Sequence, residues 1–521
     1  MRWHEWTRFP ILYDHIDAES CLSEQHIPHR RIMPTAQESL MSKKRPLPTP
    51  LQALAVLTVF LSMACSFTVF LDLPVLLALF FGWFVIMTLG LKLGYRYREL
   101  EEAAAFGVFE GMPALLILFA VGAMTGSWIA GGIVPGIIYY GLATIAPSLF
   151  LPTALLICSI TALCTGTSWG AAGTAGIAMM GIGDGLGIPP ALTAGAVLSG
   201  VYFGDKLSPL SDSVLLASSM SDVEIRAHIQ GMLPISLMAY IITLVLFTIT
   251  SLSYSGQHDL AHINEIMMLL KQRFDISLLC FVPPGVILIL LALRQPAFPV
   301  ITFGGLLGIT WAVLLQGNTP IESLHSIWAV PYVDSDHSFI SNLLSRGGME
   351  SIMTSVAMII FGLGFGSLLV KVGVVQLLAG KLESYITNES RLTNCTLLTA
   401  FLGNLLGSAM YVSLILTPKL MVKTYDQQKA DRRLLSRNTE FGGTLTSGMV
   451  PWSDNGTYMT GVLGVATLSY LPFMWLSWIS IILAVGVSWT RTRAGKTTTF
   501  TKDGRSQHAQ SNPLLARDQT L

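Results

Sequence analysis

The chain has 521 residues, of which 52% are hydrophobic and only 12% are charged. Soluble globular proteins contain about 25% charged residues, so this composition excludes an ordinary soluble protein and indicates an integral membrane protein. The formal net charge is zero and no basic tract with interleaved aromatic residues occurs, so nothing indicates a nucleic-acid partner. The apolar segments have about the 20 residues of a membrane-spanning helix, whereas barrel strands would be short and alternating.

Residues 1–50 form a polar segment rich in His and Arg, and we predict a cytoplasmic tail here. Its four histidines are irregularly spaced, which favours a disordered tail over a metal site. The string Met-Ser-Lys-Lys-Arg at 41–45 looks like an alternative translation start, which suggests that residues 1–40 are not translated. The six cysteines of the chain form no Cys-x-x-Cys pair, so we interpret them as packing residues and expect no bound cofactor.

Two apolar segments, 51–71 and 73–91, follow the tail. They are joined so tightly around Asp72 that we predict a helical hairpin. Basic residues flank the hairpin on both sides, namely Lys43, Lys44 and Arg45 before it and Lys92, Arg96 and Arg98 after it. Both flanks are therefore expected in the cytoplasm by the positive-inside rule. The region 51–111 would comprise this hairpin and an amphipathic linker.

Residues 112–255 are apolar but rich in Gly, Ser and Thr, which let membrane helices approach closely and supply hydroxyl oxygens. A connecting region, 256–351, adds two further spans and a polar loop. Lys271 and Arg273 weakly favour the cytoplasm for the start of this region, whereas the acidic segment 317–349 is expected outside.

Residues 352–490 form a second apolar region, which contains the strongest cytoplasmic signal of the chain, the basic segment 419–437. Residues 491–521 begin as a basic tail and are also expected in the cytoplasm. Both termini on one side require an even number of crossings. We therefore predict an all-α polytopic membrane protein with about 10–12 transmembrane helices.

One stretch, Gly-Asp-Lys-Leu-Ser-Pro-Leu-Ser-Asp at 204–212, sets three charges into sequence that is otherwise typical of lipid-embedded helix. A charged side chain at the bilayer centre costs about 2.5 to 3.5 kcal/mol, so such residues usually face a cavity and mark an ion or substrate path. Pro209 removes a backbone donor and disfavours helix at Ser208, which leaves carbonyls free within the membrane. The sequence therefore predicts a binding site at this break.

The pattern around the break occurs twice. Three landmarks recur in the same order at nearly constant offset: Pro-Leu-Ser-Asp at 209–212 and Pro-Trp-Ser-Asp at 451–454, offset 242; Gly-Thr-Ser-Trp at 166–169 and Gly-Ser-Ala-Met at 407–410, offset 241; and Leu-Pro at 233–234 and 471–472, offset 238. They indicate two duplicated halves, within 112–255 and 352–490. Many transporters consist of inverted repeats whose interrupted helices meet at the midplane of the membrane, and we expect that arrangement here.

The residue types at the breaks suit a sodium ion, which as a hard cation prefers oxygen ligands. Asp212 and Asp454 would supply the anionic oxygens, one from each half. Neutral oxygens would come from freed backbone carbonyls and from five hydroxyl groups, those of Thr167, Ser168, Ser208, Ser211 and Ser453. Because burial disfavours a charged carboxylate, H+ and Na+ would compete for the same Asp side chains. A structural alternative stays open, in which Asp212 and Asp454 only cap helices beside the breaks.

Asp205 and Lys206 have no counterparts in the second half, where the aligned residues are Ser447 and Gly448. This asymmetry indicates that the first half carries more of the proton chemistry. We count Asp205 among the candidate Na+ ligands as well. Lys206 is either a counter-ion that leaves when Na+ arrives or a structural ion-pair partner of Asp205.

Three strings carry a strong resemblance to the NhaC family of Na+/H+ antiporters: Gly-Asp-Lys-Leu-Ser-Pro-Leu-Ser-Asp-Ser at 204–213, Gly-Thr-Ser-Trp-Gly at 166–170 and Val-Pro-Gly-Ile-Ile-Tyr-Tyr-Gly at 134–141. The resemblance runs from about residue 51 to residue 490 and implies a secondary transporter of the bacterial inner membrane with inverted repeats, in which Na+ and H+ are the transported ions. It also brings in a second activity of the same family, Na+-linked exchange of malate and lactate.

Three other functions remain as alternatives. An organic-acid exchanger is possible because helix N-termini at the breaks can bind carboxylates, although no Arg lies in the predicted site. A passive channel would dissipate gradients without counter-flow. An intramembrane aspartyl protease would need the Gly-x-Gly-Asp string at 181–184 and the Pro-Ala-Leu string at 190–192 on separate helices, together with a membrane Tyr-Asp pair, whereas Tyr425 and Asp426 fall in the basic segment.

Overall fold

The computed structural model describes residues 45–71, 73–254, 260–330, 347–383 and 385–493. The chain divides into a short unit, 1–46, and a large unit, 47–521, and the large unit contains all of the helices described below. Residues 1–44 and 494–521 of the predicted tails, Asp72 and residues 331–346 of the acidic segment lie outside the described residues. The predictions made for them stay predictions.

The first half of the large unit runs from the N-terminal hairpin to a long helix with an internal proline. Its α-helices are α2 (Pro50–Cys65), α3 (Val75–Lys92), α4 (Tyr97–Glu110), α5 (Met112–Ala130), α6 (Ile133–Thr144), α7 (Phe150–Thr165), α8 (Ser168–Ala171), α9 (Ile177–Gly185), α10 (Pro190–Leu207), α11 (Asp212–Met220) and α12 (Ile225–Tyr254). A π-helical turn, Ala172–Gly176, joins α8 to α9.

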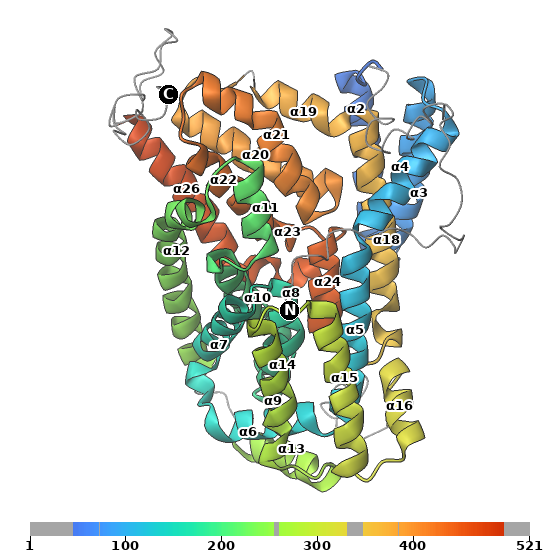
Figure 1. Ribbon diagram of the computed structural model, residues 1–521, viewed down its shortest axis with the longest axis vertical. Coiled ribbons are helices and arrows are strands. Elements are labelled where there is room, and N and C mark those ends of the chain that lie inside the picture. The colour runs from blue at the N-terminus through green and yellow to red at the C-terminus, as the bar shows by residue number, and fades with distance from the viewer. Residues whose placement is uncertain (1–44, 72, 255–259, 331–346, 384, 494–521) are drawn as a thin grey trace, which may run out of the picture. The chain divides into compact units, whose positions relative to one another are not determined.

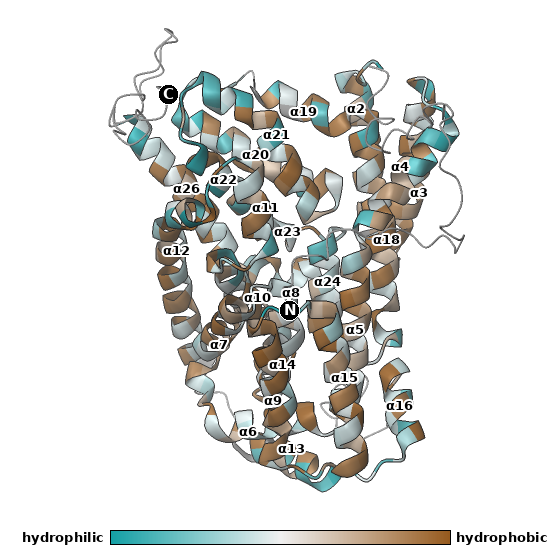
Figure 2. Cartoon of the chain, in the orientation of Figure 1, coloured by the Kyte–Doolittle hydropathy of each residue, from teal (hydrophilic) through white to brown (hydrophobic). Residues whose placement is uncertain are grey.

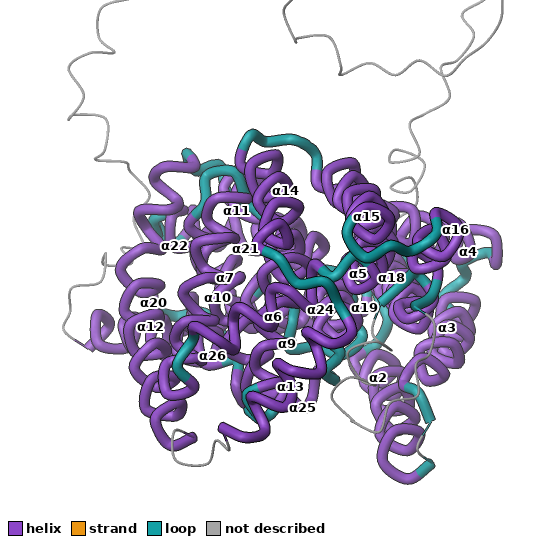
Figure 3. Tube along the Cα trace, turned by 90° about the horizontal axis from the view of Figure 1, so that it is seen from below, coloured by secondary structure: helices purple, strands orange, loops and turns teal. Residues whose placement is uncertain are grey.

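The connecting region and the second half are also helical. Their α-helices are α13 (Leu260–Arg273), α14 (Val282–Ala292), α15 (Ala297–Leu314), α16 (Pro320–Trp328), α18 (Met353–Val372), α19 (Val374–Glu383), α20 (Glu389–Gly407), α21 (Met410–Gln427), α22 (Arg432–Gly442), α23 (Thr444–Ser447), α24 (Asp454–Leu463), α25 (Thr467–Tyr470) and α26 (Trp475–Arg493). The described part of the chain contains helices and loops and no strand (Figure 3). The predicted all-α class is therefore confirmed.

Seven described helices are long and apolar enough to cross a membrane, or up to nine segments if each of two bent helix pairs counts as one span. Helices α10, α20 and α21 have 18, 19 and 18 residues but are not among them, because they carry charged and amide side chains. The number of crossings predicted from the sequence stays a prediction. The polar helices are those that surround the predicted site.

The outer helices show why the chain suits a lipid environment. On α12 the side chains of Ile241, Val245 and Ile249 are all exposed, at the four-residue spacing that places them on one helix face. Brown, hydrophobic colour covers α12 and α3, whereas teal, hydrophilic colour is concentrated on α22 and at the ends of the molecule (Figure 2). Helices α2 and α3 lie on one side of the large unit and α12 and α26 on the other, with α10 and α24 between them (Figures 1 and 3).

The backbone repeats its special conformations in the two halves. Three residues with a left-handed backbone in the first half have a left-handed counterpart 241 or 242 residues later: Gly132 and Gly373, Gly166 and Ser408, and Asp222 and Gly464. Each pair terminates corresponding helices, namely α5 and α18, α7 and α20, and α11 and α24. The local structure thus follows the sequence repeat. The inverted relation between the halves and their exact boundaries stay predictions.

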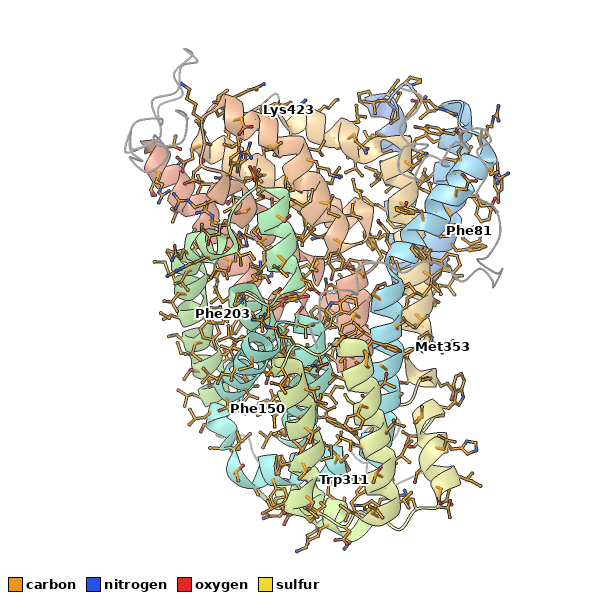
Figure 4. All side chains as sticks on the ribbon, in the orientation of Figure 1. Phe81, Phe150, Phe203, Trp311, Met353 and Lys423 are labelled. Atoms are coloured by element: carbon orange, nitrogen blue, oxygen red, sulfur yellow. The ribbon has the colours of Figure 1, made fainter. Side chains whose placement is uncertain are left out.

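Two topological predictions conflict with each other. Lys423, in the basic segment of α21, lies at one end of the large unit, and Trp311 lies at the opposite end (Figure 4). Helices α13 and α16 both lie at the Trp311 end (Figure 1). The start of the connecting region, with Lys271 and Arg273, therefore cannot be cytoplasmic while the basic segment 419–437 is cytoplasmic. We discard the weaker signal, because two basic residues at the end of an amphipathic helix are poor evidence for orientation.

Candidate ion and substrate site

In each half a helix is interrupted at the landmark that comes first along the chain, Gly-Thr-Ser-Trp at 166–169 and its counterpart at 407–410. Helix α7 ends at Gly166, with φ 67°, and the chain continues through Thr167 into α8. Helix α20 ends in the same way at Ser408, with φ 57°, before α21. A left-handed backbone costs a non-glycine residue about 1 kcal/mol or more, so Ser408 is held in this conformation by its surroundings. The structure therefore has an interruption at this position in both halves.

The Pro-x-Ser-Asp landmark, at 209–212 and 451–454, interrupts another helix in each half. Helix α10 ends at Leu207, the chain becomes extended at Ser208, and α11 begins at Asp212. In the second half, α23 ends at Ser447, before Pro451, and α24 begins at Asp454. The breaks predicted from the two prolines are therefore present.

The two breaks of each half lie against one another. In the first half a Cβ atom at Gly166 would lie 2.6 Å from the Cβ of Leu210, so only glycine allows this approach. In the second half the carbonyl of Ser408 accepts a hydrogen bond of 2.9 Å from the backbone N–H of Asp454. Each half thus brings two irregular segments with polar backbone groups together inside the helical unit.

Asp454 is buried, as predicted, with 3% of its surface exposed. Its carboxylate accepts hydrogen bonds from the backbone N–H groups of Met410, at 3.1 Å, and Asn455, at 2.6 Å. The carboxylate therefore lies at the N-termini of both α21 and α24, where the helix dipoles favour a negative charge. These contacts agree with the helix-capping alternative, and they leave acceptor capacity on the carboxylate for a cation.

Asp212 does not share this environment, because its side chain is exposed. It is the first residue of α11, and its neighbours Ser211 and Ser213 occupy the buried face, with 3.1 Å between their hydroxyl oxygens. Of the two carboxylates expected to supply the anionic oxygens, only that of Asp454 is therefore buried. The exposed carboxylate is still close to the site, since it acts electrostatically on the hydroxyl of Tyr411, as do Asp205 and Asp454.

Asp205 is the buried carboxylate of the first half, with 4% of its surface exposed. The hydroxyl side chains of Ser168 and Ser211 lie beside its carboxylate. Three of the predicted ligands, from α10, α8 and the start of α11, thus form one oxygen cluster. Such a cluster of carboxylate and hydroxyl oxygens suits a hard cation.

The other predicted hydroxyl ligands have structural roles. Ser453 caps α24: its Oγ accepts a hydrogen bond of 2.9 Å from Gly456 N–H and donates to a backbone carbonyl. Thr167 caps α8 by accepting from Gly170 N–H at 3.3 Å. The buried hydroxyl of Ser208 accepts a long hydrogen bond of 3.4 Å from Leu210 N–H. These hydrogen bonds hold the interrupted segments in place, whereas the cluster around Asp205 offers the better cation site.

Lys206 has a partner that the sequence did not predict. Its ammonium group lies 3.3 Å from Oε2 of Glu440, and the Lys206 and Glu440 side chains are 2% and 0% exposed. Lys206 also donates a hydrogen bond of 2.8 Å to the backbone carbonyl of Glu440. Asp205 was the expected partner, but Glu440 of α22 holds that position. Glu440 was not predicted as a site residue because it follows the basic segment 419–437 closely. Its position next to the apolar string that begins at Phe441 could have indicated that it is buried.

Aromatic and amide side chains connect the breaks of the two halves. The indole of Trp169, on α8, stacks on the ring of Tyr458, on α24, with 4.2 Å between the ring centroids and 12° between the planes. The indole N–H of Trp169 donates to the side-chain oxygen of Asn455, and the Tyr458 hydroxyl donates to the Trp169 carbonyl at 2.9 Å. Asn455 and Tyr458 could not be predicted from the sequence, since their partner Trp169 lies almost 290 residues away.

We expect Trp169→Phe to weaken this connection without removing it. The smaller ring retains the stacking but leaves the buried Asn455 oxygen without its donor, which costs about 1–3 kcal/mol. Thermal unfolding of the purified protein in detergent should show a lower midpoint. Phe303→Leu, at an exposed position on α15, should leave the midpoint unchanged and serves as the control. An unchanged midpoint in Trp169→Phe would mean that the contact does not hold the breaks together.

The structure does not provide the second catalytic carboxylate that an intramembrane aspartyl protease would need. Asp426, of the Tyr-Asp pair, is exposed at the end of α21 and forms an ion pair with Arg432 at 3.0 Å. Asp184 lies on α9, and the Pro-Ala-Leu string begins α10. The structure therefore brings the two proposed carboxylates into no common site.

Comparison with known proteins identifies the family of the chain. The sequence model of the Na+/H+ antiporter family matches residues 200–491, more than half of the chain, and that of the C4-dicarboxylate anaerobic carriers matches residues 13–253. The chain belongs to the Na+/H+ antiporter family. It is thus related to transporters of the NhaC type, as the resemblance implied.

Individual relatives differ in the solutes for which they are named. The chain is 52% identical to a malate-2H+/Na+-lactate antiporter of Bacillus subtilis, over 88% of this chain and 97% of the relative. It is 33% identical to an arginine/ornithine antiporter of Halobacterium salinarum, over 76% and 82%, and 32% identical to the Na+/H+ antiporter NhaC of Alkalihalophilus pseudofirmus, over 75% and 84%. These relatives are antiporters, so the chain is a multi-pass membrane transporter of this class.

Proposed function

We propose that this protein exchanges small organic acids of the malate and lactate type across the bacterial inner membrane, coupled to Na+ and H+. The observation that carries this proposal is the 52% identity to the malate-2H+/Na+-lactate antiporter, which extends over nearly its whole length. The match of the first half to the C4-dicarboxylate carriers supports it independently. We predicted simple Na+/H+ exchange from the sequence, with organic-acid exchange as the alternative, and the comparisons favour the alternative.

The cation would bind at Asp205, Ser168 and Ser211, with Asp454 as a second anionic group nearby. Both aspartates are buried, which disfavours their charged form when no cation is bound. A carboxylate in such a place either takes up a proton or binds Na+. Competition between the two ions at the same oxygens would then couple their movements.

Orientation in the membrane is a part of the same proposal. The basic residues Lys419 and Lys423 of α21 are expected in the cytoplasm by the positive-inside rule. Helices α13 and α16 would then lie at the outer surface. Both chain termini would be cytoplasmic.

Exchange in proteoliposomes tests the function. Vesicles loaded with Na+ and lactate are diluted into Na+-free buffer with labelled malate, and we expect malate uptake that requires internal Na+ and lactate and is accompanied by proton uptake. Vesicles loaded with K+ and lactate provide the control. Na+-driven proton movement with no malate uptake would instead support the simple Na+/H+ exchanger, and malate flux that needs no counter-solute would support a channel.

A further inference from the structure

A small cavity lies between α5, α6 and the π-helical turn that joins α8 to α9. Its volume is about 10 Å³, which is about the room that one water molecule needs. The side chains and backbone that line it include those of Thr125 and Trp128 on α5, Ile137 on α6, and Gly173, Thr174 and Ala178 on the turn and α9. We call it the α5–α9 cavity. The cation cluster around Asp205 does not include any of these residues.

The polar side chains of the cavity wall have their hydrogens engaged elsewhere. The hydroxyls of Thr125 and Thr174 each donate, at 2.8 Å, to the backbone carbonyl four residues earlier. The indole N–H of Trp128 donates to the carbonyl of Gly304 at 2.8 Å. Each threonine oxygen keeps lone pairs that can accept a hydrogen bond or bind a cation. The described side chains of the wall therefore suit water and Na+, whereas a carboxylate would find no free donor among them.

The cavity lies on the way from one end of the molecule to the cation cluster. A Cβ atom at Gly173 would lie 3.3 Å from the hydroxyl of Tyr458, which donates to the Trp169 carbonyl at 2.9 Å. Trp169 directly follows Ser168, a member of the cation cluster. On the other side, α6 lies towards the end of the large unit that carries Trp311 (Figures 1 and 4).

The two walls of the cavity are held by different partners. Helix α5 packs closely on α15, where a Cβ atom at Gly308 would lie 2.3 Å from the Ser127 hydroxyl oxygen. The opposite wall continues from α8, which is joined to α24 through Trp169 and Tyr458. It includes the π-helical turn, a conformation that is frequent at functional sites. A displacement between these two groups of helices would change the size of the cavity.

We propose that the α5–α9 cavity is the closed outer end of the cation path. In the outward-facing state the π-helical turn and α9 lie further from α5, and the cavity opens towards the surface beyond α6. Na+ then passes the hydroxyl oxygens of Thr125 and Thr174 before it reaches the cluster around Asp205. Because the wall presents acceptors, it admits the cation and not the organic anion. This inference rests on the Na+ coupling and the orientation that belong to the proposed function.

The dependence of exchange on Na+ at each face of the membrane tests the path. Thr125→Val and Thr174→Val remove one oxygen and keep the shape of the side chain. In right-side-out membrane vesicles the KM for external Na+ should rise about threefold to tenfold in each variant. In inverted vesicles the KM for Na+ should stay at the wild-type value, and the KM for malate should not change in either kind of vesicle. Thr125→Ser and Thr174→Ser should restore the wild-type KM.

The control for these variants is Thr248→Val on α12. Its hydroxyl also donates to the carbonyl four residues earlier, at 2.7 Å, and Thr248 does not line the cavity. Exchange by this variant should match the wild type at both faces. Equal changes of the Na+ KM at both faces in the cavity variants, or no change at either, would overturn the proposal, because a purely structural role has no side.

Chemical modification gives a second readout. A membrane-impermeant methanethiosulfonate reagent, added outside during exchange, should modify Ala178→Cys faster than it modifies the wild type, whose own cysteines set the background. The modification should slow exchange. Ala123→Cys, on α5 but outside the cavity wall, is also buried and should stay at the background rate. Modification of Ala178→Cys at no more than the background rate would show that the cavity is only a packing defect.

The failure of this inference can be told from the failure of the proposed function. If the wild type takes up malate without any need for Na+, the Na+ coupling of the proposed function fails. If the wild type needs Na+ but the threonine and cysteine variants behave like it at both faces, only the assignment of the path fails.

Discussion

Asp454→Asn should abolish exchange while leaving a folded protein. The amide retains an oxygen that can accept hydrogen bonds from Met410 and Asn455 N–H groups, so the caps of α21 and α24 largely persist. The negative charge is lost, however, and with it the group that would bind Na+ or a proton. Removing a buried charge from such a site costs about 2–5 kcal/mol, or more than about 30-fold in binding. Na+-dependent malate uptake in proteoliposomes measures this effect.

The control for this prediction is Asp222→Asn. Asp222 is exposed and also follows a helix, and its ion pair with Arg432 at 2.9 Å lies at the surface. Surface pairs contribute about 0–1 kcal/mol, so exchange should remain near the wild-type rate. If Asp454→Asn retained exchange with unchanged coupling, Asp454 would be only a helix cap. Asp454→Ala, which removes the caps as well, should lower the thermal midpoint in either case.

Gly366→Ala should strongly destabilise the second half. Gly366, on α18, faces the end of α20, and a Cβ atom there would lie 2.0 Å from the carbonyl oxygen of Gly407. One turn earlier, a Cβ at Gly362 would lie 2.5 Å from the carbonyl oxygen of Trp452. Helix α18 therefore packs closely against both breaks through its glycines. The added methyl group meets rigid backbone, so we expect a loss of about 1–3 kcal/mol or more and reduced exchange.

Gly285→Ala is the matched control, because among the described residues no atom outside its chain neighbours and its own helix backbone lies within 4 Å of a Cβ at this position on α14. Alanine is a better helix former than glycine by about 1 kcal/mol, so this variant should be neutral or slightly more stable. Fluorescence-detected size-exclusion chromatography after heating compares the two proteins. Equal melting of Gly366→Ala and the wild type would show that α18 can move away from the breaks without cost.

Features that depend on local sequence could be predicted. The apolar spans follow from composition, and the interruptions follow from Pro209 and Pro451 together with the repeated landmarks. The left-handed backbone at Gly166 and Ser408 then agrees with the alignment of the halves. Burial of Asp454 was expected on the same grounds. These properties depend on residues that are close together in the sequence, which explains why they could be predicted from it.

Features that depend on packing between distant segments could not be predicted from the sequence. Asp212 and Asp205 are only seven positions apart, and the direction of each side chain is set by how α10 and α11 pack, so the sequence favoured the wrong one as the buried carboxylate. Glu440 looked like the end of a cytoplasmic basic segment because its partner, Lys206, is 234 residues away. Asn455 and Tyr458 were missed for the same reason.

The stack of Trp169 on Tyr458 has a consequence for movement during transport. An aromatic face and two hydrogen bonds join the interrupted helices of both halves, so these helices cannot slide independently without separating flat rings and breaking buried polar contacts. We therefore expect the interrupted core to travel as one rigid body against the outer helices. Cross-linking within that core should be tolerated, whereas cross-linking the core to its periphery should stop turnover.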